Sequence, residues 1–265
     1  MVSGKKSMFR KVDKLFIPFI TAGDPNEEAS IELALSLEKC GADSIELGVP
    51  YSDPLADGPV IQRASIRARK NGMNIEKTME LAFKMKKRGL KIPIILFTYY
   101  NPVLQLGENH FFALMEKNQI EGLLIPDLPF EESEELRKKC EEHGIYFISM
   151  VAPTSQARVK KIAENASGFL YCVSSLGVTG ERQSFDEHIQ DFLRQVKQYA
   201  SVPVAVGFGI STNEHVKKFS ELSDGVIIGS AIIRQIEKLE PLLTNPETKQ
   251  KGLEEFEGFI ADLLH

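Results

Sequence analysis

Short apolar segments alternate with longer amphipathic segments along the whole chain. The apolar segments have the length of β-strands and are rich in Ile, Leu and Val, whereas the segments between them repeat apolar residues at helical spacing. Strands that helices cover on both faces pair in parallel. The alternation therefore predicts an α/β protein with eight parallel strands, at residues 15–21, 44–48, 94–98, 122–125, 146–151, 169–173, 204–207 and 226–229.

The segments between the strands carry helix signals. Asp24 followed by Pro25 is typical of a helix start, and Gly41, Gly89 and Gly144 stand where helices end. Residues 241–251 read as a surface loop before a last amphipathic helix. No linker or internal repeat interrupts the series, which predicts a single domain over residues 1–265. Helices are expected at residues 27–40, 74–87, 131–142, 185–199 and 213–222.

Eight strands with eight following helices fit either an open doubly wound sheet or a closed (β/α)8 TIM barrel, and counting does not distinguish the two. The segments after the last two strands favour the barrel. They read Gly207-Phe208-Gly209-Ile210-Ser211 and Gly229-Ser230-Ala231. Glycines allow close approach of the backbone to an anion, and helix N-termini direct N–H groups at it. These segments predict a phosphate site, the alternative being two tight turns that use glycine for geometry alone.

Composition narrows the class of protein further. The 265 residues are 43% hydrophobic and carry a formal net charge of −5, which argues against a nucleic-acid partner. The chain shows no signal peptide and no run of 18 apolar residues, so we expect a cytoplasmic protein without a membrane segment. Its three cysteines are far apart and unpaired in spacing, which indicates a reducing compartment.

A carboxylate interrupts the second predicted strand. If Ile45 and Leu47 face the surrounding helices, Glu46 points into the barrel, where burial raises the pKa of a carboxyl toward a value useful for acid–base catalysis. The alternative is a structural carboxylate. Asp53 and Asp57 follow on a proline-stiffened loop. The three carboxylates could form a metal site, but no histidine lies near a strand end, and we expect no metal.

Two further observations concern mechanism. None of the eight predicted strands contains lysine, so a Schiff-base mechanism has no nucleophile. The segment from Ser174 to Arg182 after the sixth strand is polar and contains glycine, which suits a lid that closes over a ligand. The alternative is an ordinary surface loop.

The longest motif in the chain is Glu46-Leu47-Gly48-Val49-Pro50 through Ser52-Asp53-Pro54-Leu55-Ala56-Asp57-Gly58-Pro59. It closely resembles the signature of the tryptophan synthase alpha subunits. The resemblance extends from about Phe9 to His265 and includes Pro18-Phe19-Ile20-Thr21-Ala22-Gly23-Asp24-Pro25, Tyr99-Tyr100-Asn101-Pro102, Pro126-Asp127-Leu128-Pro129 and Gly177-Val178-Thr179-Gly180, together with both glycine-containing segments described above.

This resemblance implies a lyase that splits indole-3-glycerol phosphate into indole and glyceraldehyde 3-phosphate without a cofactor. Glu46 is then the acid and base at the indole ring carbon and the adjacent hydroxyl, and Asp57 stabilises charge at the indole N–H. Thr179 of the lid meets Asp57, and Tyr171 lies by Glu46. The implied indole pocket is walled by Phe19, Leu96 or Phe97, Tyr99, Leu124 and Ile125. The implied phosphate contacts are Gly180, Gly209, Ile210, Gly229 and Ser230, and Phe208 is a further implied substrate contact.

The resemblance also implies a beta subunit as partner in an alpha2beta2 complex, contacted through the loops around Asp53, Asn101 and Asp127. One departure is Ser175, where relatives often carry Arg. Two alternatives stay open. Indole-glycerol-phosphate synthase and phosphoribosylanthranilate isomerase are phosphate-binding barrels with a working Lys or Cys at early strand ends, where this chain has Thr21 and Glu46. The second alternative is a non-catalytic subunit that binds a glycerol phosphate.

Overall fold

A computed structural model describes residues 7–9, 14–173, 182–207 and 209–265, with only the backbone for 182–187. Its strands are all paired in parallel. They run in the spatial order β5-β4-β3-β2-β1-β9-β8-β7-β6. The strands are β1 (Leu15–Thr21), β2 (Ile45–Gly48), β3 (Ile94–Phe97), β4 (Gly122–Leu124), β5 (Tyr146–Phe147), β6 (Ser149–Val151), β7 (Leu170–Val173), β8 (Val204–Gly207) and β9 (Gly225–Ile228).

The two edge strands of this sheet, β5 and β6, belong to one continuous stretch of chain. β5 and β6 are separated by Ile148 alone, and the Ile148 N–H donates to the carbonyl of Leu123 in β4 at 2.8 Å. Ser149 then pairs with Leu170 of β7. Because the segment from Tyr146 to Val151 contacts β4 on one side and β7 on the other, the sheet closes into a barrel. The predicted (β/α)8 barrel is confirmed, and each of the eight predicted strands is found.

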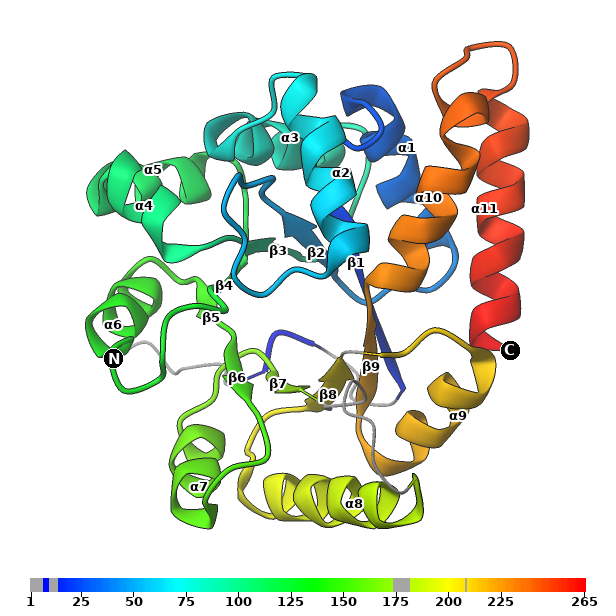
Figure 1. Cartoon of the computed structure of the whole chain (residues 1–265). Helices are drawn as coiled ribbons and strands as arrows, with labels where there is room; N and C mark the ends of the chain where they lie inside the picture. The colour runs from blue at the N-terminus through cyan, green and yellow to red at the C-terminus, as the bar shows by residue number, and fades with distance from the viewer. Residues whose placement is uncertain (1–6, 10–13, 174–181, 208) are drawn as a thin grey trace.

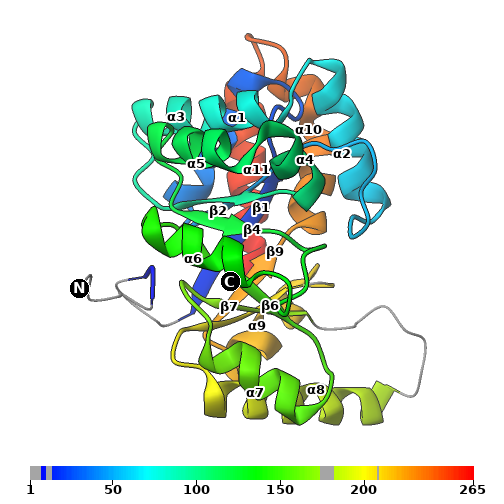
Figure 2. The same ribbon diagram turned by 90° about the vertical axis from the view of Figure 1, so that its left-hand side faces the viewer.

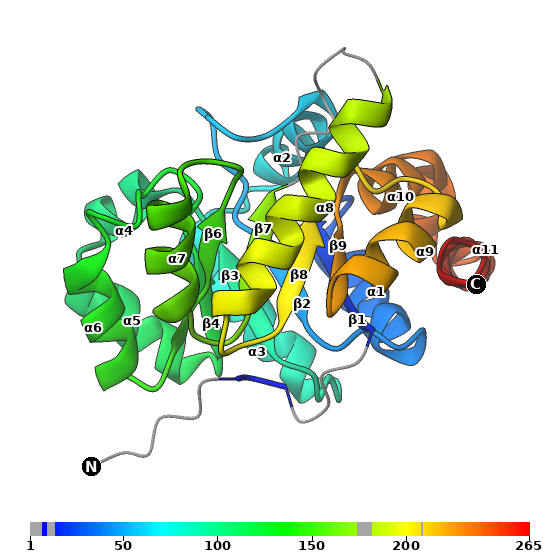
Figure 3. The same cartoon turned by 90° about the horizontal axis from the view of Figure 1, so that it is seen from below.

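Helices surround the strands on all sides (Figure 3). α7 and α8 cover the side of the sheet opposite α1 and α3 (Figure 2). Some strands are followed by more than the one helix expected, because α2 precedes α3 after β2, and both α4 and α5 follow β3. The helices are α1 (Glu27–Lys39), α2 (Pro59–Lys70), α3 (Ile75–Lys87), α4 (Tyr100–Leu106), α5 (Glu108–Lys117), α6 (Glu134–Glu142), α7 (Gln156–Glu164), α8 (Arg182–Tyr199), α9 (Asn213–Leu222), α10 (Ser230–Leu243) and α11 (Lys249–Leu264).

Two local predictions need correction. The first helix is capped by Asn26, whose side chain accepts from the Ala29 N–H at 2.8 Å, and not by Asp24. The predicted loop over 241–251 is shorter, because Pro241 lies inside α10 and α11 begins at Lys249. Pro241 has no N–H group, so the last turn of α10 lacks one helical hydrogen bond. Among the described residues, no helix is long and apolar enough to cross a membrane.

Two apolar layers hold the barrel together. Side chains such as Ile45, Leu47 and Leu96 pack between the sheet and the helices. Side chains such as Ile17, Ile95 and Ile227 fill the barrel interior. Successive residues of a strand point to opposite faces, so each strand supplies both layers. The barrel interior is thus a packed core, and a cavity for a ligand lies at one end of it.

A buried ion pair ties three elements beside that end. The Asp24 carboxylate, just after β1, is fully buried and accepts from Arg67 of α2 at 2.7 and 2.9 Å. Arg67 also donates to Glu237 of α10 at 2.6 Å. α2 and α10 lie side by side (Figure 1). This pair therefore fixes the relative positions of the two helices that follow β2 and β9.

We expect Arg67→Gln to lower the free energy of unfolding by about 3 kcal/mol or more, because it leaves the buried Asp24 without a counter-charge. Arg63 is the matched control: it donates to Glu237 at 2.8 Å but is half exposed. Arg63→Gln should cost much less stability than Arg67→Gln, because water screens an exposed ion pair. Urea denaturation at pH 7 measures both values, and equal losses for the two variants would contradict the assignment.

Candidate active site

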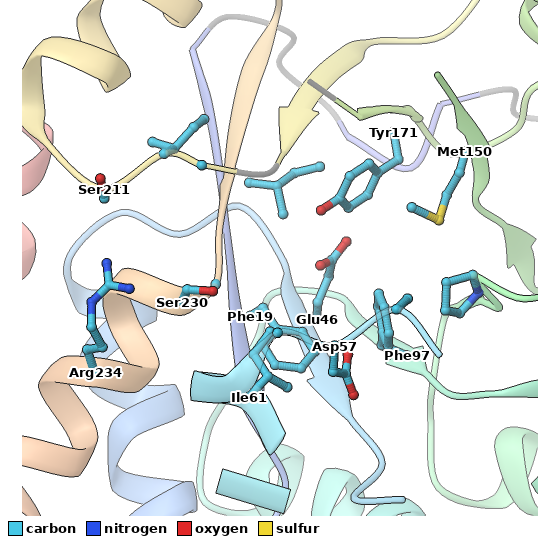
Figure 4. A pocket seen from close by; sticks show the side chains of 17 residues that line it. Phe19, Glu46, Asp57, Ile61, Phe97, Met150, Tyr171, Ser211, Ser230 and Arg234 are labelled. Carbon is cyan, nitrogen blue, oxygen red and sulfur yellow. The ribbon is translucent and has the colours of Figure 1, made fainter. Parts of the chain in front are cut away.

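The carboxyl ends of the strands surround a cavity of about 330 Å³ (Figure 4). This size falls within the roughly 300–1,000 Å³ of small-molecule sites. The end of the barrel where it lies is the end at which barrel enzymes carry their active sites. The lining residues are Phe19, Glu46, Ala56, Asp57, Gly58, Ile61, Phe97, Pro126, Met150, Tyr171, Gly209, Ile210, Ser211, Ile227, Gly229, Ser230 and Arg234.

Glu46 enters this cavity from the middle of β2. Ile45 and Leu47 pack in the outer layer against the helices, as predicted. The alternation of the strand then turns Glu46 inward, at the level of Phe19 in β1 and Ile95 in β3. Its side chain is only 1% exposed yet lines the cavity, so the carboxyl group is removed from bulk water but accessible to a ligand.

Burial determines the protonation of Glu46. It raises the pKa of the carboxyl from 4.5 to about 8, because the charged form loses its hydration. Within the described part of the chain, Oε1 of Glu46 has no hydrogen-bond partner. At neutral pH the group is therefore a carboxylic acid with an oxygen free to bind a ligand. This is the state that a general acid requires.

Tyr171 of β7 lies opposite Glu46, whose carboxyl group points toward the Tyr171 hydroxyl in Figure 4. Burial raises the pKa of Tyr171 well above its ordinary value, and the charge of Glu46 raises it further. The tyrosine thus keeps its proton. The predicted proximity of Tyr171 and Glu46 is seen in the structure.

Two glycines create the space for the aromatic rings of the site. A Cβ on Gly207 would collide with the Tyr171 ring and hydroxyl, and a Cβ on Gly48 would collide with the Phe19 ring. Gly207 and Gly48 are the last residues of β8 and β2. Sequence reasoning read these glycines as parts of motifs and missed this role, because the ring that each accommodates comes from a different strand.

Asp57 reaches the cavity from the loop between β2 and α2. The backbone N–H of Ala56 donates to the Tyr99 hydroxyl at 3.0 Å. Burial raises the pKa of Asp57, and a hydrogen bond from Tyr99 opposes part of that rise. Tyr99 itself does not line the cavity, contrary to its expected place in the indole wall. It lies behind the loop, where it holds Ala56 and Asp57 in position.

The opposite end of the cavity is formed by backbone. Gly209 has a φ of 74°, a conformation that favours glycine. Gly229 caps α10, so the N–H groups of Ser230 and the next two residues have no acceptor within the helix. Exposed amides at a helix N-terminus bind anions. Thr179, Gly180 and Phe208, together with the lid and Ser175, lie outside the described residues.

The apolar wall differs in part from the expected one. The rings of Phe19 and Phe97 meet edge to face at 5.3 Å. Leu96 and Ile125 point outward into the helix layer. Leu124 faces the barrel interior but does not line the cavity. The register of β2 with β3 gives Phe97 the inward direction of Ile95, and this is the signal that would have selected Phe97 over Leu96.

Other lining residues were not anticipated, notably Ile61, Met150, Ile227 and Arg234. Ile61 and Arg234 stand on helices one turn from a loop, which places them near the site only once the helix direction is known. Within the described residues, no group of three His, Cys, Asp or Glu side chains is arranged to hold a metal ion.

A buried carboxylic acid at the carboxyl end of a closed parallel barrel, facing main-chain amides, is the arrangement of a (β/α)8-barrel enzyme site and is suited to acid–base catalysis. The family model of the tryptophan synthase alpha chain matches residues 6–264. The chain belongs to this family. It is accordingly a lyase of tryptophan biosynthesis, and the family reaction is the cleavage of indole-3-glycerol phosphate to indole and glyceraldehyde 3-phosphate.

Individual relatives agree with this assignment. The tryptophan synthase alpha chain of Bacillus pumilus is 65% identical over 93% of this chain and 92% of its own length. The tryptophan synthase alpha chain of Bacillus subtilis strain 168 is 61% identical over 93% of this chain and 92% of its own length. Among solved structures, subunit alpha from Legionella pneumophila superposes with a TM-score of 0.83 at 34% identity, over 95% of this chain and 91% of that chain.

Proposed function

We propose that Glu46 carries a closed proton cycle in the cleavage of indole-3-glycerol phosphate. The neutral acid donates its proton to the indole ring carbon that bears the glycerol chain. The resulting carboxylate accepts the proton of the adjacent hydroxyl while the carbon–carbon bond breaks. The electron pair of the broken carbon–carbon bond neutralises the protonated ring. Indole and glyceraldehyde 3-phosphate, which carries the new aldehyde, then leave, and Glu46 is again protonated. The observation that carries this proposal is the buried, unpartnered Oε1 of Glu46 in the described site, at a pKa of about 8.

Asp57 acts at the indole nitrogen in this scheme. Protonation of the ring carbon places positive charge on the ring system, and a carboxylate near the N–H stabilises it. The Ala56 contact and the hydrogen bond from Tyr99 support this role, since they hold the loop before α2 against the cavity. Tyr99 is then a positioning residue that acts through Asp57.

The rest of the substrate follows from the shape of the cavity. Phe19, Phe97 and Tyr171 enclose the indole ring, and the amides at Gly209, Ile210, Gly229 and Ser230 bind the phosphate. Thr179, Gly180 and Phe208 are proposed to complete the substrate contacts on the strength of the sequence motif. Because one cavity contains both Glu46 and the amides, a single small molecule can contact both.

We further propose that a tryptophan synthase beta subunit binds at this end of the barrel and that the complex acts in the cytoplasm. Leu55 and Leu104, 80% and 52% exposed, are two of the three exposed large apolar side chains among the described residues. Asn101 of α4 donates to the Tyr51 hydroxyl at 2.9 Å and so joins α4 to the loop after β2. A Pyrococcus furiosus structure with a TM-score of 0.80, at 33% identity, is described as an alpha2beta2 complex.

The test is an indole-release assay on indole-3-glycerol phosphate, with and without a beta subunit. We expect slow release by this chain alone and faster release with the partner. An absence of indole under both conditions would instead favour a non-catalytic phosphate-binding subunit. A rate that the beta subunit does not change would remove the proposed partnership while leaving the lyase activity intact.

A further inference from the structure

Arg234 lies on α10 four residues after Ser230, and both line the cavity. Residues four apart share one face of a helix, and helical side chains lean toward the helix N-terminus. The guanidinium group therefore extends back toward the amides that begin α10. Figure 4 shows it beside Ser211 and Ser230, at the end of the cavity away from Phe97.

The charge of Arg234 is not neutralised by the described parts of the protein. The Arg234 side chain forms no ion pair or hydrogen bond with another described residue. The nearby carboxylate of Glu237 is already engaged, since hydrogen bonds from Arg63 and Arg67 lower its pKa to about 2. Arg234 is also the one Lys, Arg or His among the described residues of the cavity lining.

Arg234 is exposed and lies in the second turn of α10, so its charged group can reach a ligand bound at the amides of the first turn. Those amides carry partial positive charge, which favours an anion. A dianion bound there attracts the guanidinium group as well. Guanidinium groups also bind phosphate with two parallel hydrogen bonds, which are stronger than bonds between neutral groups.

We propose that Arg234 binds the phosphate group of the substrate and makes the site selective for phosphorylated indole-glycerol. This inference rests on the proposed function. Main-chain amides alone hold the phosphate through weakly charged donors, whereas Arg234 adds a full positive charge on the solvent side. It stands far from the reacting carbon atoms, so it acts on binding and not on the proton cycle of Glu46.

The test compares Arg234→Gln and Arg234→Lys with Lys238→Gln, an exposed cation on the same helix outside the cavity lining. For indole-3-glycerol phosphate we expect Arg234→Gln to raise KM roughly tenfold with little change in kcat. Arg234→Lys should retain part of the affinity, and Lys238→Gln all of it. For indole-3-glycerol without phosphate, Arg234→Gln should match the wild-type kcat/KM.

Calorimetric titration with inorganic phosphate provides a second measurement that needs no turnover. Arg234→Gln should weaken phosphate binding roughly tenfold relative to wild type and Lys238→Gln. Equal phosphate affinity in all three proteins, or an equal loss on the phosphorylated and unphosphorylated substrates, would overturn the role of Arg234. A wild-type chain that binds phosphate but releases no indole would refute the proposed function and not this residue's role.

Discussion

Glu46→Gln should lower kcat for indole release by about 10²–10⁴-fold, the usual contribution of a positioned acid–base group. Glutamine keeps the size and burial of the side chain but has no proton to donate at neutral pH. KM for indole-3-glycerol phosphate should change little, because the phosphate amides and the apolar wall are untouched. Glu80→Gln is the control, since Glu80 is exposed on α3, away from the cavity. Full activity in Glu46→Gln would exclude the proton cycle.

The same residue determines the basic limb of the pH profile. The reaction begins with protonated Glu46, whose pKa burial raises to about 8. We therefore expect wild-type kcat/KM to fall as pH rises through about 8. The residual activity of Glu46→Gln should lack this limb. A profile unchanged by the substitution would assign the limb to another group.

Stability should respond to Glu46 as well. The Glu46 carboxyl loses its proton near pH 4.5 in the unfolded chain and near pH 8 in the folded chain. Its contribution to the free energy of unfolding is therefore complete below pH 4.5 and is lost as pH rises toward 8. The loss is on the order of 5 kcal/mol across this window. Glu46→Gln does not titrate and should gain stability relative to wild type between pH 5 and pH 8, as measured by urea denaturation.

Asp57→Asn should lower kcat/KM by about 10²–10³-fold, the typical cost of losing one group that stabilises developing charge. Asparagine keeps an oxygen that accepts from Tyr99, so the loop before α2 should keep its position. What is lost is the negative charge beside the indole nitrogen. Steady-state kinetics on indole-3-glycerol phosphate measure the effect, with the exposed Asp262→Asn as control.

The acid limb of the pH profile offers an independent check on Asp57. Burial raises the pKa of this carboxyl above its ordinary 3.8, so it loses its charge at a higher pH than an exposed aspartate. Wild-type kcat/KM should fall as pH drops through that raised value, and Asp57→Asn should lack this fall. An acid limb that survives in Asp57→Asn would argue that Asp57 acts by shape alone.

The amino-acid sequence by itself determined the strands, the barrel class and the inward direction of Glu46. Each depends on local periodicity: a strand alternates between two faces, and apolar Ile45 and Leu47 on one face leave the other for the carboxylate. The glycines at 209 and 229 were also recognisable as a candidate anion site, because backbone freedom and helix N-termini are properties of a few consecutive residues.

The tertiary structure alone decided which side chains meet. The pairing of Ile95 with the inward-facing Glu46 places Ile95 on the inner face, so Phe97 points inward and Leu96 outward. Barrel closure also brings Tyr171 from β7 across to Glu46, where burial by distant strands raises the pKa of the glutamate to about 8. The placement of Tyr99 behind Asp57 and of Arg234 beside Ser230 depends on helix orientation. The contacts between different strands and loops join residues far apart in the chain, and no local pattern encodes them.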